Sequence, residues 1–203
     1  MNTLIALGEW FFRQRSWTPI PFMLALVLLR FRESTDLMTT WAPGLLLLAC
    51  GEGLRVWGVA VVGKESRTRG GGVGRLATSG PYAHVRNPLY VGNLLLTLGA
   101  TCISGLLWFL PVAVLLFAAQ YIPIVLWEES VLTERYGPQY TAYCQRVPRW
   151  MPRGRRRTSG SQAPAYQWRA AFWSERSTFG TLALLLLVMM AKAALPHLLN
   201  PGK

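Results

Sequence analysis

The sequence contains little charge and few residues that could build a metal site or a disulfide framework. Only 15% of the 203 residues are charged. The three cysteines, Cys50, Cys102 and Cys144, form no CxxC pair, and the first two lie inside apolar runs, so neither disulfides nor a zinc site are expected. The two histidines, His84 and His197, are far apart and have no neighbouring ligand pattern. We therefore predict a protein that uses no metal.

Acidic residues are especially scarce, and this imbalance sets the charge of the protein. The chain has nine Asp and Glu residues against 21 Lys and Arg residues, which gives a formal net charge of +12. Such an excess could indicate a nucleic-acid-binding protein. However, the basic residues cluster between apolar runs. This is typical of a membrane protein whose basic loops stay in the cytoplasm and contact anionic lipids. We therefore expect lipid partners and no nucleic acid.

Long apolar runs are abundant, and 52% of the residues are hydrophobic. A helix needs about 20 residues to cross a bilayer, and five runs approach or reach that length. The runs are Trp17–Phe31, Ala42–Gly63, Leu89–Ile103, Leu106–Trp127 and Thr178–Leu199. The sequence therefore predicts an all-α, multi-span transmembrane protein with about five spans.

The composition divides the chain into three parts. Residues 1–152 contain four of the apolar runs and form the expected membrane core. Residues 153–177 form a basic linker followed by Tyr166–Arg176, where aromatic and charged residues alternate. Such a segment could lie flat on the membrane surface. Residues 178–203 contain an additional C-terminal transmembrane helix.

The orientation in the membrane follows from the arginines. The short turn at Ser104 and Gly105 joins two apolar runs into a helical hairpin, so the segments that flank the hairpin lie on the same side. These segments are 64–88 and 128–177, and both are rich in arginine. The positive-inside rule places them in the cytoplasm.

A dense polar and aromatic stretch, TSGPYAHVRNPLYVG at Thr78–Gly92, precedes the third apolar run. Asn87 and Pro88 predict the start of a helix, because asparagine is a good N-cap and proline is tolerated in the first turn. Three side chains near this end have no role in capping: Tyr82, Arg86 and Tyr90. Phenols and a guanidinium at a helix N-terminus suit the carboxylate or ribose of a small polar ligand.

A second stretch of this kind, Glu128–Pro152, follows the fourth apolar run. It begins with the adjacent carboxylates Glu128 and Glu129. Such a pair is often only a solvated helix end, but it could also hold a ligand with an ammonium or sulfonium group. Tyrosines at 136, 140 and 143 share one helix face. Because Gly137 and Pro138 interrupt this helix, we predict that it folds back as a lid over the membrane face.

Two other features have both a structural and a functional interpretation. The glycine-rich Gly70–Gly74 follows no predicted strand and lacks a GK[ST] sequence, so a mobile loop is favoured over a phosphate-binding loop. Glu52 and Arg55 share one helix face within an apolar run. Charges in such a run either pair with each other or line a functional cavity, and the sequence does not decide between these roles.

Two motifs, in the same order along the chain as in the family, resemble those of the isoprenylcysteine carboxyl methyltransferase family. This family is related to the phospholipid N-methyltransferases. The first is TSG-x-Y-A-x-x-R-x-P-x-Y-V-G, and it precedes an apolar hairpin. After the hairpin come EE-x-x-L and YG-x-x-Y-x-x-Y-x-x-RVP. The resemblance covers about Leu76–Pro152. It implies an integral membrane enzyme that transfers the methyl group of S-adenosylmethionine (SAM) to a lipophilic substrate without a metal.

The resemblance also implies the site residues. Carried over by position, the cofactor-binding residues are Gly74, Arg75, Leu76, Ala77, Tyr82, Asn87, Pro88, Leu89, Tyr90 and Glu128. The candidate catalytic residues are Glu128, Glu129 and Arg86. Two positions depart from the family pattern: Asn87 replaces a usual histidine, and Ile124 replaces a substrate-contacting arginine. The second departure argues against a prenylated cysteine as the substrate.

The leading hypothesis is therefore a SAM-dependent membrane methyltransferase whose cofactor site faces the cytoplasm. The acceptor could be a carboxylate, an amine or a thiol on a lipophilic or small molecule. Two alternatives stay open. One is a membrane reductase of the sterol-reductase type that uses NADPH, and the other is a membrane scaffold without catalytic activity.

Overall fold

In a computed structural model, which describes residues 2–62, 76–152 and 166–199, every regular element is a helix. The predicted all-α fold is confirmed. In chain order, the elements are α1 (Asn2–Gln14), α2 (Pro19–Leu28), α3 (Leu37–Val62), the short 3-10 helix η2 (Gly80–Ala83), α4 (Pro88–Ile103), the 3-10 helix η3 (Leu107–Phe109), α5 (Leu110–Tyr136), α6 (Pro138–Arg146) and α7 (Trp168–Leu199).

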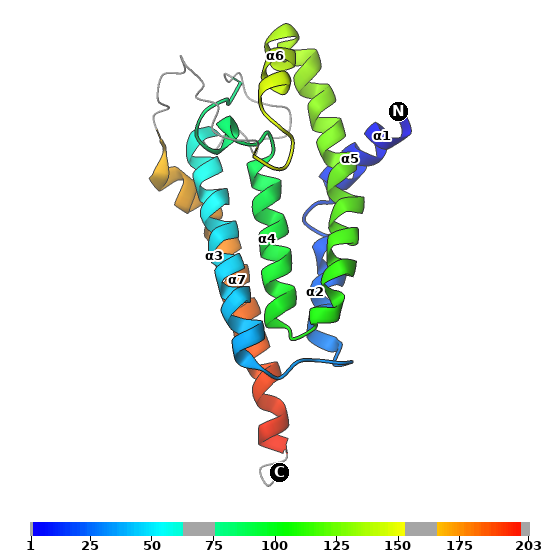
Figure 1. Ribbon diagram of the computed structural model, residues 1–203, viewed down its shortest axis with the longest axis vertical. Coiled ribbons are helices and arrows are strands. Elements are labelled where there is room, and N and C mark those ends of the chain that lie inside the picture. Colours follow the sequence, from blue (N-terminus) through cyan, green and yellow to red (C-terminus); the bar gives the residue numbers. More distant parts are fainter. Residues whose placement is uncertain (1, 63–75, 153–165, 200–203) are drawn as a thin grey trace.

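The longer helices form an elongated bundle (Figure 1). Helix α4 packs against α3, which also contacts α7, while α5 leans away from α4 towards one end of the bundle. Helix α6 folds back at that end of α5, and η2 lies at the same end (Figure 1). The two polar segments that flank the α4–α5 hairpin therefore meet there. We call this end of the bundle the motif end.

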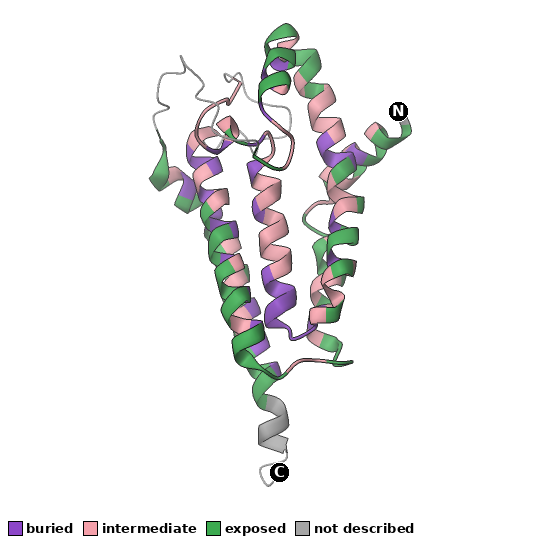
Figure 2. Cartoon of the chain, viewed as in Figure 1, coloured by how far each residue is buried: buried purple, intermediate pink, exposed green. Residues whose placement is uncertain are grey.

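Three of the described helices are long and apolar enough to cross a membrane: Leu37–Val62, Leu107–Tyr136 and Trp168–Ala194. Helices α2 and α4 are apolar but shorter, at 10 and 16 residues. Five full spans are therefore not confirmed. Exposed residues cover the outer faces of the bundle, and many of them are large and apolar (Figure 2). This surface suits an integral membrane protein, whose helices contact lipid on their outer side.

Glycines allow α3 and α4 to pack closely. A Cβ atom added to Gly51 or to Gly92 would lie 2.8 Å from the carbonyl oxygen of the other glycine. Gly44 and Gly99 form a similar contact nearer to the α4–α5 turn. Small residues at such positions let two membrane helices approach until their backbones are in van der Waals contact. The contact fixes α4 on α3 and so places the first turn of α4 at the motif end.

Replacing Gly51 with alanine should destabilise the protein by about 1–3 kcal/mol, because the added methyl group overpacks this contact. Gly53→Ala, in the same helix, is the matched control, since a Cβ atom at Gly53 meets nothing within 4 Å. The thermal unfolding midpoints of both variants in the same detergent test the prediction. Equal midpoints would show that α3 and α4 are not in such close contact.

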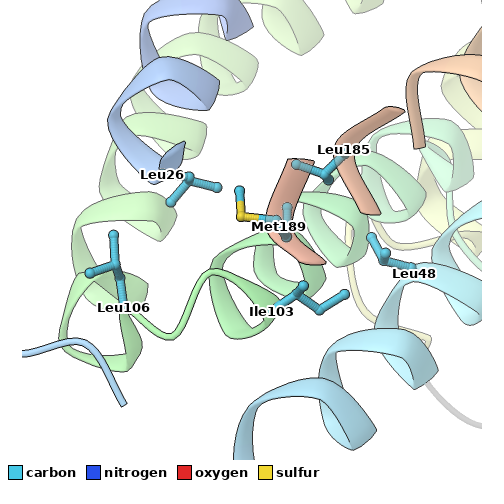
Figure 3. Packing of buried hydrophobic residues seen from close by; sticks show 7 residues of the cluster. Leu26, Leu48, Ile103, Leu106, Leu185 and Met189 are labelled. Carbon is cyan, nitrogen blue, oxygen red and sulfur yellow. The ribbon is translucent and has the colours of Figure 1, made fainter. Parts of the chain in front are cut away.

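The main apolar core lies near the α4–α5 turn, away from the motif end. Its buried residues come from α2, α3, α4, α7 and the segment before α5: Leu26, Leu48, Ala100, Ile103, Leu106, Leu185 and Met189 (Figure 3). Buried Lys192 lies beside this core. Its Nζ contacts the carbonyl oxygens of Leu26, Leu29 and Ser104 at 3.0, 2.9 and 3.2 Å and the carboxylate of Glu33 at 3.3 Å. The ammonium thus satisfies carbonyl groups at the ends of α2 and α4.

Helix α7 begins at Trp168 rather than at the predicted Thr178. The segment Tyr166–Arg176, for which the sequence suggested a position along the membrane surface, therefore belongs largely to a continuous helix. Its early residues pack on α3: Ala171 is fully buried against the apolar side chains of that helix. The Gln167 N–H also donates to the carbonyl oxygen of Ala60 at 2.9 Å. These contacts hold the first turns of α7 against α3.

A buried charged network explains why α7 binds α3. Arg55 pairs with Glu52 at 3.2 Å and with Glu175 at 2.6 Å, and the Glu175 side chain is 0% exposed. Arg55 also donates a hydrogen bond to the Asn93 side chain, which in turn donates to the Tyr121 hydroxyl at 3.2 Å. Buried charges need partners of this kind. The Glu52–Arg55 pair thus belongs to a network that links α3, α4, α5 and α7.

Candidate functional site

The segment before α4 is held against residues 138–152, which we call the lid. The Arg86 N–H donates to the Pro148 carbonyl oxygen at 2.9 Å, and the Tyr143 hydroxyl donates to the Tyr82 carbonyl oxygen at 2.8 Å. Burial raises the pKa of the Tyr143 phenol well above its usual range, although Arg86 acts in the opposite direction. The hydroxyl therefore stays protonated and donates at neutral pH. These bonds bring the two sequence motifs together.

The start of α4 is predicted correctly in position but not in mechanism. The helix begins at Pro88, as expected, and Pro88 is buried. The Asn87 side chain, however, forms no capping hydrogen bond. It donates instead to the carbonyl oxygen of Arg149 at 3.2 Å. The predicted capping role of this side chain is thus wrong, and its amide nitrogen links the start of α4 to the lid instead.

Glu128 lies on α5 at the motif end and faces two phenols. Its carboxylate is a hydrogen-bond partner of Tyr90. Burial raises the pKa of the Tyr82 phenol well above its usual range, and the negative charge of Glu128 raises it further. Tyr82 therefore stays a neutral hydrogen-bond donor. Within the part of the chain that the structure describes, Glu128 forms no ion pair. The site thus presents a carboxylate bordered by aromatic hydroxyls.

Glu129 has a different environment from its neighbour, because two arginines bind it. Arg149 donates two hydrogen bonds to its carboxylate at 2.9 and 2.6 Å, and Arg86 lies 3.1 Å from it. The hydrogen bonds to Glu129 raise the pKa of Arg149. Arg86 also donates to the Cys144 sulfur at 2.8 Å. Glu129 and Arg86 therefore hold the lid on the ends of α4 and α5.

Replacing Glu129 with glutamine should loosen the lid. Charge-assisted hydrogen bonds contribute about 1.5–3 kcal/mol each, so we expect hydrogen exchange in α6 to become about 10-fold faster or more. Mass spectrometry of deuterated peptides from residues 138–147 provides the measurement. Glu134→Gln is the control, since Glu134 is exposed on the same helix. Unchanged exchange in the Glu129 variant would contradict the proposed holding role.

The remaining predicted cofactor-binding residues lie in different surroundings, and some of them are not described. Gly74 and Arg75 lie outside the described residues. Leu76 packs against the tyrosines of α6, and Ala77 is half-buried next to it. Leu89 lies in the first turn of α4 and contacts α3 near the motif end. Among the described members of the set, Tyr82 and Tyr90 are thus the ones for which an interaction with Glu128 is given.

Arg15 is a residue of this site that the sequence did not single out as a candidate. It is half-buried after the end of α1, and its guanidinium lies 4.0 Å from the centroid of the Phe12 ring. Its positive charge acts on Glu128, Tyr90 and Tyr121. The only signal in the sequence is an arginine between two apolar segments, which is common at membrane surfaces.

Glu128, its neighbouring phenols and Arg15 have the chemistry to bind a cationic group and an anionic group of a ligand. A carboxylate next to phenol rings suits a sulfonium or ammonium group, because the charge and the ring faces both attract a cation. A guanidinium close by suits a carboxylate or a phosphate. The motif end therefore has the chemistry to hold a cationic group and an anionic group next to each other.

Comparison with known proteins gives a family match in this region. Residues 39–139, which include α4, Tyr82 and Glu128, match the family model described as phospholipid methyltransferase. The cobalt-zinc-cadmium resistance protein CzcN of Cupriavidus metallidurans is 33% identical over 121 residues, which are 56% of this chain and 52% of that protein. The nickel-cobalt-cadmium resistance protein NccN of Alcaligenes xylosoxydans xylosoxydans is 29% identical over 120 residues, or 59% and 52% of the two chains. The chain thus spans about half the length of these curated relatives. No solved structure matches it.

Proposed function

The chain belongs to the phospholipid methyltransferase family, and from this membership we propose that it transfers the methyl group of SAM to a lipophilic or small acceptor in the membrane. The observation that supports this proposal best is the Glu128 carboxylate, which has no ion-pair partner in the described part of the chain and faces Tyr82 and Tyr90. The site residues fit the cationic donor, because SAM carries its reactive methyl group on a sulfonium.

In the proposed reaction, SAM supplies the methyl group, which forms a bond to a lone pair of the acceptor while the carbon–sulfur electron pair returns to sulfur. Glu128 would attract the positive charge of the donor, and Tyr82 and Tyr90 would orient it through hydrogen bonds and ring contacts. The lid, held by Glu129, would keep water away from these groups. Orientation of the two reactants provides much of the rate in such a displacement.

The proposal also concerns the type of methyl acceptor and the side of the membrane that the site faces. The relatives are named for resistance to metals, and their names state no substrate. Ile124 stands where the resemblance leads us to expect a substrate-contacting arginine, so we favour an acceptor other than a prenylated cysteine. We place the site on the cytoplasmic side because basic residues flank the α4–α5 hairpin at the motif end.

Isothermal titration of the purified protein with SAM and with NADPH tests the proposal. We expect SAM to bind and NADPH not to bind. Binding of NADPH alone would favour a reductase, and binding of neither would favour a scaffold. A second measurement uses radiolabelled SAM and a polar lipid extract, followed by separation of the labelled product. Transfer of the label to a species in the extract is the result expected of a methyltransferase.

A further inference from the structure

Helix α7 packs on α3 and lies outside the residues that match the family model (Figure 1). The carboxylate of its Glu175 is fully buried and accepts a hydrogen bond from Arg55 of α3 at 2.6 Å. Thr178, about one turn further along α7, donates to the same carboxylate oxygen at 2.8 Å. Arg55 is thus held from the side of α7, and this contact restricts the orientation of its guanidinium.

Arg55 in turn sets the orientation of the Asn93 amide on α4. A guanidinium can only donate hydrogen bonds, so it binds the amide oxygen of Asn93. The amide nitrogen is therefore left to donate elsewhere, and it donates to the Tyr121 hydroxyl oxygen on α5 at 3.2 Å. The position of this hydroxyl is thus linked, through two side chains, to a carboxylate on α7.

The Tyr121 ring belongs to an aromatic cluster that reaches the site. It stacks on Phe117 of the same helix, with 4.2 Å between the ring centroids. It also contacts the ring of Tyr90, with 5.1 Å between the centroids. Tyr90 lies in the first turn of α4, and its phenol interacts with the Glu128 carboxylate. A shift of the Tyr121 ring would therefore change the position of Tyr90 in the site.

We propose that Asn93 and Tyr121 are positioning residues, through which α7 holds Tyr90 in the orientation that the bound methyl donor requires. Apolar side chains at these places would pack the helices together at least as stably. Hydrogen bonds with a fixed direction instead select one arrangement of the side chains. The inference rests on the proposed function, and it assigns a role in that function to the C-terminal helix.

Rates of methyl transfer in variants of Asn93 and Tyr121 test the inference. Label transfer from radiolabelled SAM to a polar lipid extract gives the rate, and titration with SAM gives the concentration of folded binding sites. The rate is expressed as kcat per binding site, which a mere loss of folded protein does not change. We expect kcat to fall about 10-fold or more in Asn93→Leu and in Tyr121→Phe, while Kd for SAM changes by less than about 3-fold, because a misplaced reactant lowers the rate more than the affinity.

Asn93→Asp tests the link between the two residues. Aspartate accepts a hydrogen bond from Arg55 as asparagine does, and the Tyr121 O–H can donate to its other oxygen, so the link persists with one hydrogen bond reversed. The kcat of this variant should therefore stay close to that of the parent protein. Thr97→Val is the matched control on α4, because the Thr97 hydroxyl donates to a carbonyl oxygen of its own helix at 2.9 Å. It should behave like the parent protein.

A double-mutant cycle tests the contribution of α7. Glu175→Gln keeps the shape of the side chain but weakens its hold on Arg55, so it should also lower kcat per binding site. When Glu175→Gln is added to Tyr121→Phe, little further loss should follow, because both changes interrupt one chain of contacts. Arg176→Met, at an exposed position of the same helix, should leave kcat unchanged.

The outcomes separate this inference from the proposed function. Unchanged kcat per binding site in Asn93→Leu and Tyr121→Phe would overturn the positioning role. A fall in Asn93→Asp as large as that in Asn93→Leu would also overturn it, and so would independent, multiplying effects of Glu175→Gln and Tyr121→Phe. In each of these cases the parent protein still labels lipid. If the parent protein labels no lipid, the proposed function itself is wrong, and the inference falls with it.

Discussion

Replacing Glu128 with glutamine is expected to weaken SAM binding more than any other single change in the site. The substitution keeps the shape of the side chain and an oxygen that Tyr90 can bind, but it removes the negative charge. Loss of one partner from a buried charge pair costs about 2–4 kcal/mol, which raises Kd by about 30- to 1,000-fold. Isothermal titration with SAM is the direct measurement.

The effect should appear in Kd more than in kcat. Positive charge leaves the sulfonium as the methyl group is transferred, so a carboxylate stabilises the bound donor at least as strongly as the transition state. An interaction of equal or greater strength in the ground state does not raise kcat. At saturating SAM, the Glu128→Gln variant should therefore recover much of the parent rate. A large fall in kcat with unchanged Kd would show that Glu128 acts in the chemical step instead.

Two control variants accompany this experiment. Glu134→Gln removes a carboxylate from an exposed position near the end of α5, and it should bind SAM like the parent protein. Glu128→Asp keeps the charge on a shorter side chain and should fall between the parent and the glutamine variant. If Glu128→Gln binds SAM as tightly as the parent protein, the site does not lie at this carboxylate.

The sequence predicted those parts of the molecule that depend on local chemistry. The break between α5 and α6 follows from Gly137, which has a φ of +49°, and from the proline after it. The start of α4 at Pro88 follows in the same way from the proline of its first turn. Because Tyr140 and Tyr143 recur at helical spacing, their common packing could also be predicted. Local rules were sufficient here since each feature depends on a few consecutive residues.

Other features could not be predicted because they depend on contacts between distant segments. Glu128 and Glu129 are adjacent and chemically identical, yet only Glu129 is bound by Arg86 and Arg149. Nothing in the local pattern distinguishes the two carboxylates; the position of the lid does. The position of Arg15 depends likewise on how α1 packs on α5. The first half of α7 likewise packs on α3 through Glu175, whose partner Arg55 is 120 positions away in the sequence.

Replacing Arg55 with methionine should cause the largest loss of stability among the changes considered for this protein. The substitution removes the ion-pair partner of Glu52 and Glu175, whose side chains are 7% and 0% exposed. Breaking a buried pair by removing one partner costs about 3–5 kcal/mol, because a charge is left without its compensation in a medium of low dielectric constant. The thermal unfolding midpoint in detergent should fall accordingly. Proteolysis near the start of α7 should also become faster, since this helix is joined to α3 through Arg55.

The charge argument can be separated from a loss of packing by a double variant. The double variant combines Arg55→Met with Glu175→Leu and so removes one buried carboxylate together with the guanidinium. It should regain part of the stability that Arg55→Met loses, because apolar residues can replace a buried ion pair without a net loss of stability. Arg176→Met is the control for α7, because Arg176 is exposed and forms no ion pair with a described residue; its guanidinium stacks on Trp173 at 4.8 Å. Its effect should stay within about 0.5 kcal/mol. A double variant as unstable as Arg55→Met alone would mean that the arginine stabilises the bundle mainly through its contact with Gly92 and not through its charge.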